Sequence, residues 1–248
     1  SMKSFGITDK GTVRKDNQDS FIIEKCTTKN GIIVSLCDGM GGANAGKIAS
    51  QLANKAFVAH IFSKLKLRTP KGKYREILQD ACAEANGVAF EYSKFDEAFS
   101  GMGTTIVGGL IESAGKGYII NVGDSRAYLI SRREEAMYQI TRDHSYVEDL
   151  VECGAITREE ARLHPRKNVI TRALGVEPQV KSDYFEFTMQ NGDTLILCSD
   201  GLSNMLTDSE ILDFTLDNPE PETLCRLLVD AALRRGAGDN VTVIAVTR

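Results

Sequence analysis

The sequence has few histidines and lacks the cysteine spacings that build zinc or redox sites. Its three histidines, His60, His144 and His164, do not have the spacing of metal ligands. Its six cysteines include no C-x-x-C pair, and several lie inside apolar runs such as "SLCDG" and "LILCSDG". Cysteines of this kind are typical of small buried side chains in a reducing compartment. Zinc chemistry and a disulfide framework are therefore not expected.

Strong net charge and long apolar segments are also missing. The net charge is −4, which predicts no attraction to nucleic acid or to an anionic membrane. No apolar run approaches the roughly 18 residues of a membrane span, and no signal peptide is visible. We therefore expect a cytoplasmic protein without membrane insertion and without a nucleic-acid partner.

The composition suits a globular fold, because 42% hydrophobic and 26% charged residues in a chain of 248 can form a sizeable core with a polar surface. Strand-like runs come first, in "KSFGIT", "SFIIEK" and "GIIVSLC". Two helical regions follow, over residues 45–65 and 74–95, where apolar residues such as Ile48, Leu52 and Phe57 recur at close to helical spacing.

Strands return in "GTTIVGGLI", "GYIINV", "RAYLIS" and "MYQIT", and the short turns between them predict antiparallel pairing. Residues 144–167 read as helical and polar. The strands "YFEFTM", "DTLILCSD" and "VTVIAVTR" complete the chain, with helices over residues 209–235. Because strands and helices are grouped rather than strictly alternating, we predict an α+β fold in one domain, with antiparallel sheets covered by helices.

The stretch "DGMGGANAGKIAS", residues 38–50, partly matches a nucleotide-binding P-loop. Gly41, Gly46 and Lys47 fit the G-x-x-x-x-G-K frame, after a strand and before a helix. The next residue is Ile48, where a P-loop needs a Ser or Thr hydroxyl for Mg²⁺, and the acid Asp38 opens the stretch. A P-loop NTPase is therefore an alternative that measurement of ATP turnover would distinguish.

Aspartates follow apolar strands at four places in the sequence, each beside a glycine. They are Asp38, Asp124, Asp200 and Asp239, and we expect each at a strand terminus, where a turn exposes it. A single aspartate of this kind is usually only a turn residue. Four of them, in a chain without a histidine or cysteine cluster, indicate a shared site.

If these strand ends converge, several carboxylates share one cleft, where mutual repulsion and burial are both unfavourable. A hard divalent cation resolves the conflict, and ligands that are all oxygen select Mg²⁺ or Mn²⁺ over zinc. Two such ions sharing a carboxylate can activate a bridging water for in-line attack on a phosphate. The acids alone leave open a nuclease or a sugar phosphatase.

An ordered set of motifs narrows the choice. The stretches "VRKDNQDS", "DGMGG", "GTT", "NVGDSRAYL", "TRDHS", "LCSDGL" and "GDNVTV" occur in this order along nearly the whole chain. In order and rough spacing they resemble the protein phosphatase 2C (PPM) family of metal-dependent serine/threonine phosphatases, of bacterial type. The resemblance implies two packed antiparallel sheets flanked by antiparallel helix pairs, an αββα sandwich. It also implies a single catalytic domain over residues 2–248, with a flap around residues 144–168.

The resemblance implies roles for individual residues. Asp38 matches the acid that bridges two metal ions, Asp200 and Asp239 match further ligands of the first ion, and Asp124 resembles the acid of a third, weaker site. Arg14 matches the arginine that grips the substrate phosphate, a task suited to a planar bidentate donor. The implied catalytic residues are Asp38, Asp19 and Arg14, and the implied ligands of two or three Mn²⁺ or Mg²⁺ ions are Asp38, Gly39, Asp200, Asp239, Asp19 and Asp124.

The sequence departs from the family pattern at two positions. Gln18 stands where many members have a glutamate, which favours Asp19 as the support of the second ion, directly or through water, and leaves the choice between them open. Met40 stands where animal members have a histidine, so no histidine acid is available there and metal-bound water is the alternative proton donor. His144 is a weak candidate for that role. Asp124 has its own alternative, a turn-capping aspartate.

The expected function is hydrolysis of phosphoserine and phosphothreonine in proteins through a metal-activated water. The implied partners are phosphoproteins, including a cognate serine/threonine kinase, and a monomer is expected. A non-catalytic family member that serves as a binding module is the second alternative. The joint presence of Arg14, Asp38, Asp200 and Asp239 argues against it.

Overall fold

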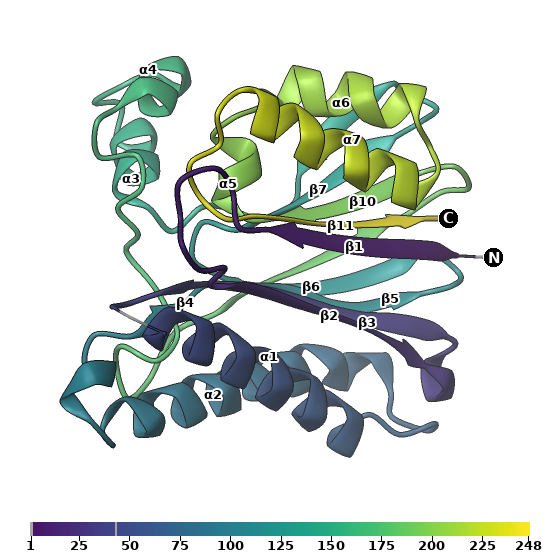
Figure 1. The fold of residues 1–248 in the computed structure, drawn as a ribbon. Coiled ribbons are helices and arrows are strands. Elements are labelled where there is room, and N and C mark those ends of the chain that lie inside the picture. The colour runs from purple at the N-terminus through teal and green to yellow at the C-terminus, as the bar shows by residue number, and fades with distance from the viewer. Residues whose placement is uncertain (1, 43) are drawn as a thin grey trace.

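Two antiparallel sheets form the centre of the computed structural model of the protein, which describes residues 2–42 and 44–248 (Figure 1). The first sheet has the order β1 (Lys3–Asp9), β11 (Val241–Thr247), β10 (Thr194–Cys198), β7 (Arg126–Ser131) and β8 (Ala136–Gln139). The second has the order β2 (Asp19–Cys26), β3 (Gly31–Met40), β5 (Ile106–Glu112), β6 (Lys116–Val122) and β9 (Asp183–Thr188), and β4 (Gly103–Thr104) pairs with β3.

Helices cover the outer face of each sheet (Figure 1). The second sheet carries α1 (Ala45–Lys64) and α2 (Tyr74–Ser93), and the first carries α5 (Asp200–Ser203), α6 (Asp208–Asp217) and α7 (Pro221–Arg234). The short helices α3 (Tyr146–Glu152) and α4 (Arg158–Leu163) project to one side. Three 3₁₀ turns complete the set: η1 (Thr27–Lys29), η2 (Lys71–Lys73) and η3 (Glu97–Phe99). The predicted αββα sandwich is confirmed.

Strand β3 shows how one strand serves two cores. Ile33 and Cys37 pack against α1 and α2, whereas Val34 and Leu36 pack between the sheets. Successive side chains of a strand point to opposite faces. A strand that is buried on both faces therefore reads as the continuous apolar run "GIIVSLC" instead of an alternating pattern.

The buried face of α1 differs from the one expected from helical spacing. Ala45, Ala49 and Ala53 are fully buried, whereas Ile48 and Leu52 are only half-buried. Small side chains let the helix backbone approach the neighbouring elements closely, and this positions the helix start beside the end of β3. The larger Phe57 and Ile61 fill the core farther along.

The helix starts in the second half of the chain are set by local capping. Thr157 and Thr207 each begin a helix, α4 and α6, with a capping box in which a glutamate at the third helical position bonds back. In α7, Glu220 caps the first turn and Pro221 occupies the first helical position. These signals explain why the expected helical regions form where they do.

The chain changes sheets between β6 and β7. The expected antiparallel pairing holds for β5 with β6 and for β7 with β8, but β6 and β7 lie in different sheets although only a short turn joins them. The turn, Gly123 to Ser125, therefore sits where the two sheets meet. This crossing brings Asp124 next to residues of both sheets.

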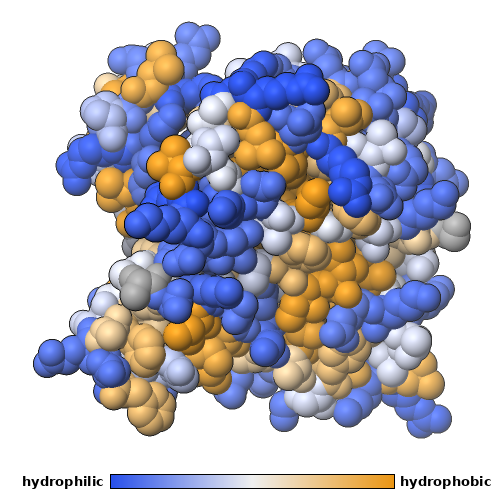
Figure 2. Space-filling view, viewed as in Figure 1, coloured by the Kyte–Doolittle hydropathy of each residue, from blue (hydrophilic) through white to orange (hydrophobic). Residues whose placement is uncertain are grey.

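The burial of the cysteines and the polarity of the surface agree with the expectations from the composition. Five cysteines are buried, as expected of small apolar side chains, whereas Cys153 is exposed after α3. Figure 2 shows a hydrophilic area where the loop between β1 and β2 lies. None of the helices in the described ranges is long and apolar enough to cross a membrane.

Candidate active site

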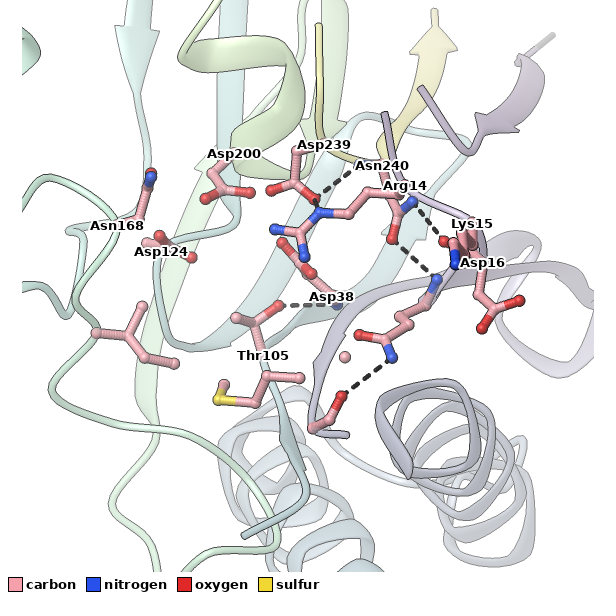
Figure 3. Close-up of a pocket in the computed structure, with 15 residues that line it drawn as sticks. Arg14, Lys15, Asp16, Asp38, Thr105, Asp124, Asn168, Asp200, Asp239 and Asn240 are labelled. Carbon is pink, nitrogen blue, oxygen red and sulfur yellow. Dashed lines mark hydrogen bonds and ion pairs between the residues drawn. The ribbon is translucent and has the colours of Figure 1, made fainter. Parts of the chain in front are cut away.

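Three of the four aspartates expected to share a site do converge. Asp38 lies in β3, Asp124 in the turn between β6 and β7, and Asp200 at the first position of α5. Each offers a carboxylate oxygen, and these oxygens all lie within 4.8 Å of one another. Figure 3 shows these three aspartates and Asp239 around one cavity.

Two details of the expectation are wrong. Asp38 is not at a strand terminus, because β3 continues to Met40 and Asp38 pairs with Asp19 of β2. Asp124 and Asp200 are not exposed by their turns: they are 7% and 9% exposed. This burial results from the tertiary structure, because the flanking strands belong to two sheets that close over the turns.

The cleft at this position has a volume of about 380 Å³. Its lining comes from segments far apart in the sequence: the loop before β2, the end of β3, the β6–β7 turn, the segment after α4 and the start of β11. Asp239 lies at the rim, where its Oδ1 is 3.4 Å from the Nε of Arg14. Arg14 is more than half exposed, so its guanidinium is available to a ligand that enters the cleft.

Asp19 lies next to Asp38 but not in the cleft lining. It is 6% exposed, and its Oδ2 accepts a hydrogen bond of 2.6 Å from Thr242 Oγ1 of β11. The side chain thus joins the two sheets beside Asp38, its partner in the β2–β3 register. Gln18, by contrast, lines the cleft and donates its amide to the Gly41 carbonyl at 3.3 Å.

The ionised form of the carboxylates in this cluster is unfavourable. Burial raises the pKa of Asp19 to about 7, and burial also raises the pKa of Asp38, Asp124 and Asp200. Negative neighbours add to the effect, because Asp19 and Asp200 raise the pKa of Asp38 further. The carboxylates therefore cannot all be ionised at neutral pH without a compensating positive charge.

The donor set fits a hard divalent cation. Asp19 Oδ1 and Asp200 Oδ1 are buried and, within residues 2–42 and 44–248, have no hydrogen-bond partner. A buried carboxylate oxygen without a donor is unfavourable. A cation that prefers oxygen ligands, such as Mg²⁺ or Mn²⁺, would satisfy these atoms and offset the repulsion.

The glycines after Asp38 serve close packing. A Cβ on Gly39 would lie 1.9 Å from the carbonyl oxygen of Gly46, and a Cβ on Gly46 would lie 2.8 Å from the Met40 nitrogen. The start of α1 therefore packs backbone to backbone against the end of β3. Lys47 is exposed at the helix start. The glycines that match the P-loop pattern are thus explained by the close packing of the start of α1 against the end of β3.

Two residues that hold the site in place were not singled out in the sequence. Thr105 Oγ1 accepts the Asp38 backbone N–H at 3.0 Å and lies 2.7 Å from Ser125 Oγ, which fixes Asp38 relative to the Asp124 turn. Asn240 accepts the Gln18 N–H through Oδ1 and donates to the Asp16 carbonyl. Thr105 lies in the motif "GTT" and Asn240 in the motif "GDNVTV", and these two motifs are the features of the sequence that could have indicated them.

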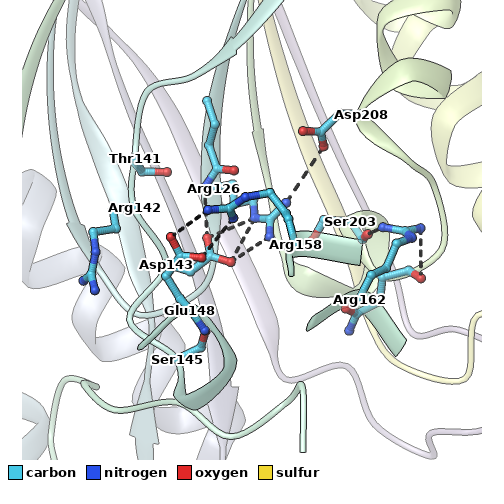
Figure 4. A network of polar contacts seen from close by, with 12 residues as sticks. Arg126, Thr141, Arg142, Asp143, Ser145, Glu148, Arg158, Arg162, Ser203 and Asp208 are labelled. Carbon is cyan, nitrogen blue, oxygen red and sulfur yellow. Dashed lines mark hydrogen bonds and ion pairs between the residues drawn. The ribbon is translucent and has the colours of Figure 1, made fainter. Parts of the chain in front are cut away.

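The α3–α4 segment is tied to the sheets by a polar network (Figure 4). Arg126 of β7 forms a bidentate pair with Asp143, at 3.0 and 2.7 Å, just before this segment. Within it Arg158 pairs with Glu148 at 3.0 Å, and Arg162 donates to the Ser203 carbonyl of α5 at 2.8 Å. A second cavity of about 230 Å³ lies here and shares Asp124 and Asp200 with the cleft.

Comparison with known proteins agrees with this arrangement. The sequence matches the protein phosphatase 2C family over residues 4–241. The serine/threonine phosphatase stp of Listeria innocua is 35% identical over 241 residues, which make up 97% of this chain and 94% of the relative. Because the family match spans most of the sequence, the agreement is not confined to single motifs.

Solved structures give the same result. Serine/threonine phosphatase Stp1 from Staphylococcus aureus is 34% identical, with coverage of 100% of this chain and 95% of that one and a TM-score of 0.91. The catalytic domain of the serine/threonine phosphatase PstP, solved in complex with two manganese ions, is 34% identical, with coverage of 99% and 97% and a TM-score of 0.83. From its sequence, its fold and the acids of its cleft, the chain belongs to the protein phosphatase 2C family.

Proposed function

We propose that this serine/threonine protein phosphatase uses divalent cations held by the acids of its cleft. The observation that carries the proposal is the convergence of Asp38, Asp124 and Asp200 within 4.8 Å, together with buried carboxylate oxygens that lack a partner among the described residues. Asp38 would be shared between two ions, with the Gly39 carbonyl beside it. The further proposed ligands are Asp200, Asp239, Asp19 and Asp124.

When bound, such ions lower the pKa of a coordinated water and neutralise the charge of a phosphate. The protein's own contribution is placement. Asp38 is held by the β2–β3 pairing and by Thr105, so its carboxylate stays in the cleft. Asp19 lies behind it, fixed by Thr242, and would support the second ion directly or through water.

Arg14 would bind the substrate phosphate. Its side chain is 61% exposed at the cleft rim, and a guanidinium can give two parallel hydrogen bonds to phosphate oxygens. Asp239 lies beside Nε of the guanidinium at 3.4 Å, so the terminal nitrogens would be left for the phosphate. Arg14 thus combines charge with geometry at the point of entry.

The leaving oxygen needs a proton, and the cleft lining contains no histidine within the described residues. Met40 is part of that lining and cannot act as an acid. We therefore propose that Asp124 would help to hold a third ion, which would supply an acidic coordinated water near the leaving oxygen. The total would then be three ions, Mn²⁺ or Mg²⁺.

The wider assignments follow from the family. We propose one catalytic domain over residues 2–248 with the α3–α4 region, residues 144–168, as its flap. Substrates would be phosphoserine and phosphothreonine proteins of the cytoplasm, including a cognate serine/threonine kinase, and the enzyme would act as a monomer. The named bacterial relatives support the substrate class.

The test is a phosphatase assay on a phosphothreonine peptide, with metal removal and return. Chelator should abolish activity and Mn²⁺ or Mg²⁺ should restore it. Loss of a residue that supports a metal ligand usually lowers activity about 10–100-fold. Asp38→Asn changes a proposed ligand itself and should lower kcat by more than that. The metal-free variant should melt at the same temperature or higher, because one buried charge is removed. Asp80→Asn, on the exposed face of α2, is the matched control and should keep full activity. Full activity in metal-free buffer would refute the metal mechanism.

A further inference from the structure

His144 makes an unusually complete set of contacts for a residue outside the cleft. It is 1% exposed and lies immediately before the α3–α4 segment. Its backbone N–H donates to the Gly123 carbonyl at 2.9 Å, and its ring Nδ1 accepts the Gly123 N–H at 3.0 Å. Both polar groups of the Gly123 backbone are therefore held by one residue, and Gly123 directly precedes Asp124.

The contacts define the ring's protonation. A backbone N–H can only donate, so Nδ1 is the acceptor and the ring proton resides on Nε2. Nε2 then donates to Asp183 Oδ2 at 2.7 Å, and Asp183 Oδ1 accepts from Arg172 at 3.1 Å. Burial lowers the pKa of His144, which favours the neutral ring that this arrangement needs.

On its opposite side, the turn from Gly123 to Ser125 is restrained by Thr105. Gly123 has φ +111°, a conformation that L side chains rarely adopt, and a Cβ there would lie 2.7 Å from Thr105 Cγ2. Ser125 bonds to Thr105 as well. With Thr105 on one side and His144 on the other, the turn that carries Asp124 has no freedom to swing.

His144 also closes the α3–α4 segment at its base. The Thr171 N–H donates to the His144 carbonyl at 3.0 Å, and Ser145 forms a bridge with Ile170. The two stems of the segment therefore meet at His144, next to Gly123. Ile170 in turn lines the cleft.

We propose that His144 is a positioning residue for Asp124: through Gly123 it holds the Asp124 carboxylate against Asp38 and Asp200. The role rests on the proposed function of Asp124 in binding a cation. Catalytic geometry tolerates displacements of only about 0.5 Å, so a turn released on the His144 side would move Asp124 out of register. The sequence motif "TRDHS" thus contributes a support for the site and not the general acid.

Two variants of similar chemistry separate the two ring nitrogens. Asparagine places its amide oxygen at the same bond distance from Cβ as Nδ1, so His144→Asn keeps an acceptor for the Gly123 N–H. Glutamine reaches as far as Nε2, so His144→Gln keeps the contact with Asp183 and loses the acceptor for Gly123. We expect His144→Gln to lower kcat about 10–100-fold, the usual cost of losing support for a metal ligand, while His144→Asn stays within about threefold of wild type. KM for the phosphopeptide should change little in either.

A double-mutant cycle with Asp124→Ala tests whether His144 acts through Asp124. In that background His144→Gln should change kcat by less than about twofold, because the group it positions is already absent. The melting temperature should fall equally in both backgrounds, which separates support of the site from general stability. His60→Gln, a half-buried histidine of α1, is the control and should leave kcat unchanged.

The outcomes are distinguishable. If His144→Gln lowers kcat by the same factor with and without Asp124, or if His144→Asn is as impaired as His144→Gln, the positioning role is overturned while the proposed function stands. If Asp124→Ala itself turns over normally, the proposed role of Asp124 fails and this inference fails with it. The expected result is a lower kcat for His144→Gln and a nearly normal kcat for His144→Asn. Adding His144→Gln to Asp124→Ala should cause no further loss of kcat.

Discussion

The Nε of Arg14 lies 3.4 Å from Oδ1 of Asp239 at the mouth of the cleft. The two residues come from opposite ends of the chain, Arg14 before β2 and Asp239 before β11. A cation bound by Asp239 would compete with the guanidinium for this carboxylate. We propose that Arg14 would then turn toward an incoming phosphate, so that the pair would link metal binding to substrate binding.

Arg14→Ala should lower kcat/KM about 10- to 100-fold, because a hydrogen bond to a charged group contributes about 1.5–3 kcal/mol. Arg14→Lys should fall in between, since lysine keeps the charge but not the bidentate geometry. Mn²⁺ binding measured by calorimetry should persist in both. Arg68→Ala, an exposed arginine far from the cleft, is the control. An unchanged kcat/KM in Arg14→Ala would remove this residue from the site.

Asp124→Ala separates a metal ligand from a turn cap. The bonds that hold the turn come from Gly123 and Ser125, and Asp124 itself lies with Asp38 and Asp200. We therefore expect a normal fold with sharply reduced turnover, which saturating Mn²⁺ rescues only in part.

A true capping aspartate provides the comparison for Asp124. Asp96 caps η3 by accepting the Ala98 N–H at 2.9 Å. Asp96→Ala should lower stability by about 0.5–2 kcal/mol and leave kcat intact. Thermal melting and a metal titration on both variants decide the matter, and the same behaviour in Asp124→Ala would make it a cap.

The contribution of Asp19 to the stability of the metal-free protein should fall as pH rises from about 4 to about 7. Burial raises the pKa of Asp19 to about 7, against 3.8 for an ordinary aspartate. At Asp19 the folded state therefore binds more protons than the unfolded chain in this window, and the stability that Asp19 contributes decreases with pH there. Asp19→Asn should weaken the dependence. Melting temperatures of the wild type and of Asp19→Asn, measured in chelator between these pH values, provide the check, and an equal pH dependence in both would contradict the expectation.

Mn²⁺ should reverse this trend. Ions bind the ionised carboxylates and release protons, so affinity increases with pH. At a free Mn²⁺ concentration 100 times its Kd, binding to the folded state alone adds about 2.7 kcal/mol. Proton release measured by calorimetry in two buffers of different ionisation enthalpy would detect the exchange directly. Equal stabilisation by Mn²⁺ at pH 5 and pH 7.5 would show that these acids are not the ligands.

Gly39→Ala and Gly87→Ala make the same chemical change with opposite expected results. A Cβ on Gly39 would lie 1.9 Å from the Gly46 carbonyl oxygen, so the strand end and α1 must separate, at a cost of about 1–3 kcal/mol. Gly87 lies inside α2, and apart from its chain neighbours and the helix's own backbone no atom of residues 2–42 and 44–248 lies within 4 Å of an added Cβ, so alanine should stabilise the helix by about 0.5–1 kcal/mol. Chemical denaturation measures both. Equal effects would mean that the close packing of Gly39 is unimportant.

The sequence by itself determined the elements and the chemical character of the site. Apolar runs, helical spacing and capping are local properties, so the strand with "GIIVSLC" and the helices α6 and α7 lie where the sequence indicates. The ordered motifs also identified the acids, because Asp38, Asp124 and Asp200 belong to short stretches that are recognisable on their own. The expectation of oxygen ligands followed from the absence of a histidine or cysteine cluster in the sequence.

Only the tertiary structure decided which strands pair and how deeply the acids are buried. β6 and β7 follow one another closely but belong to different sheets, because pairing depends on contacts with β9 and β10 that lie far along the chain. The burial of Asp124, the bond from Thr242 to Asp19 and the clamp of His144 on Gly123 all result from that crossing or from the packing of the two sheets. Local periodicity carries no information about such partners, since residues that meet in space there are separated by up to 223 positions in sequence.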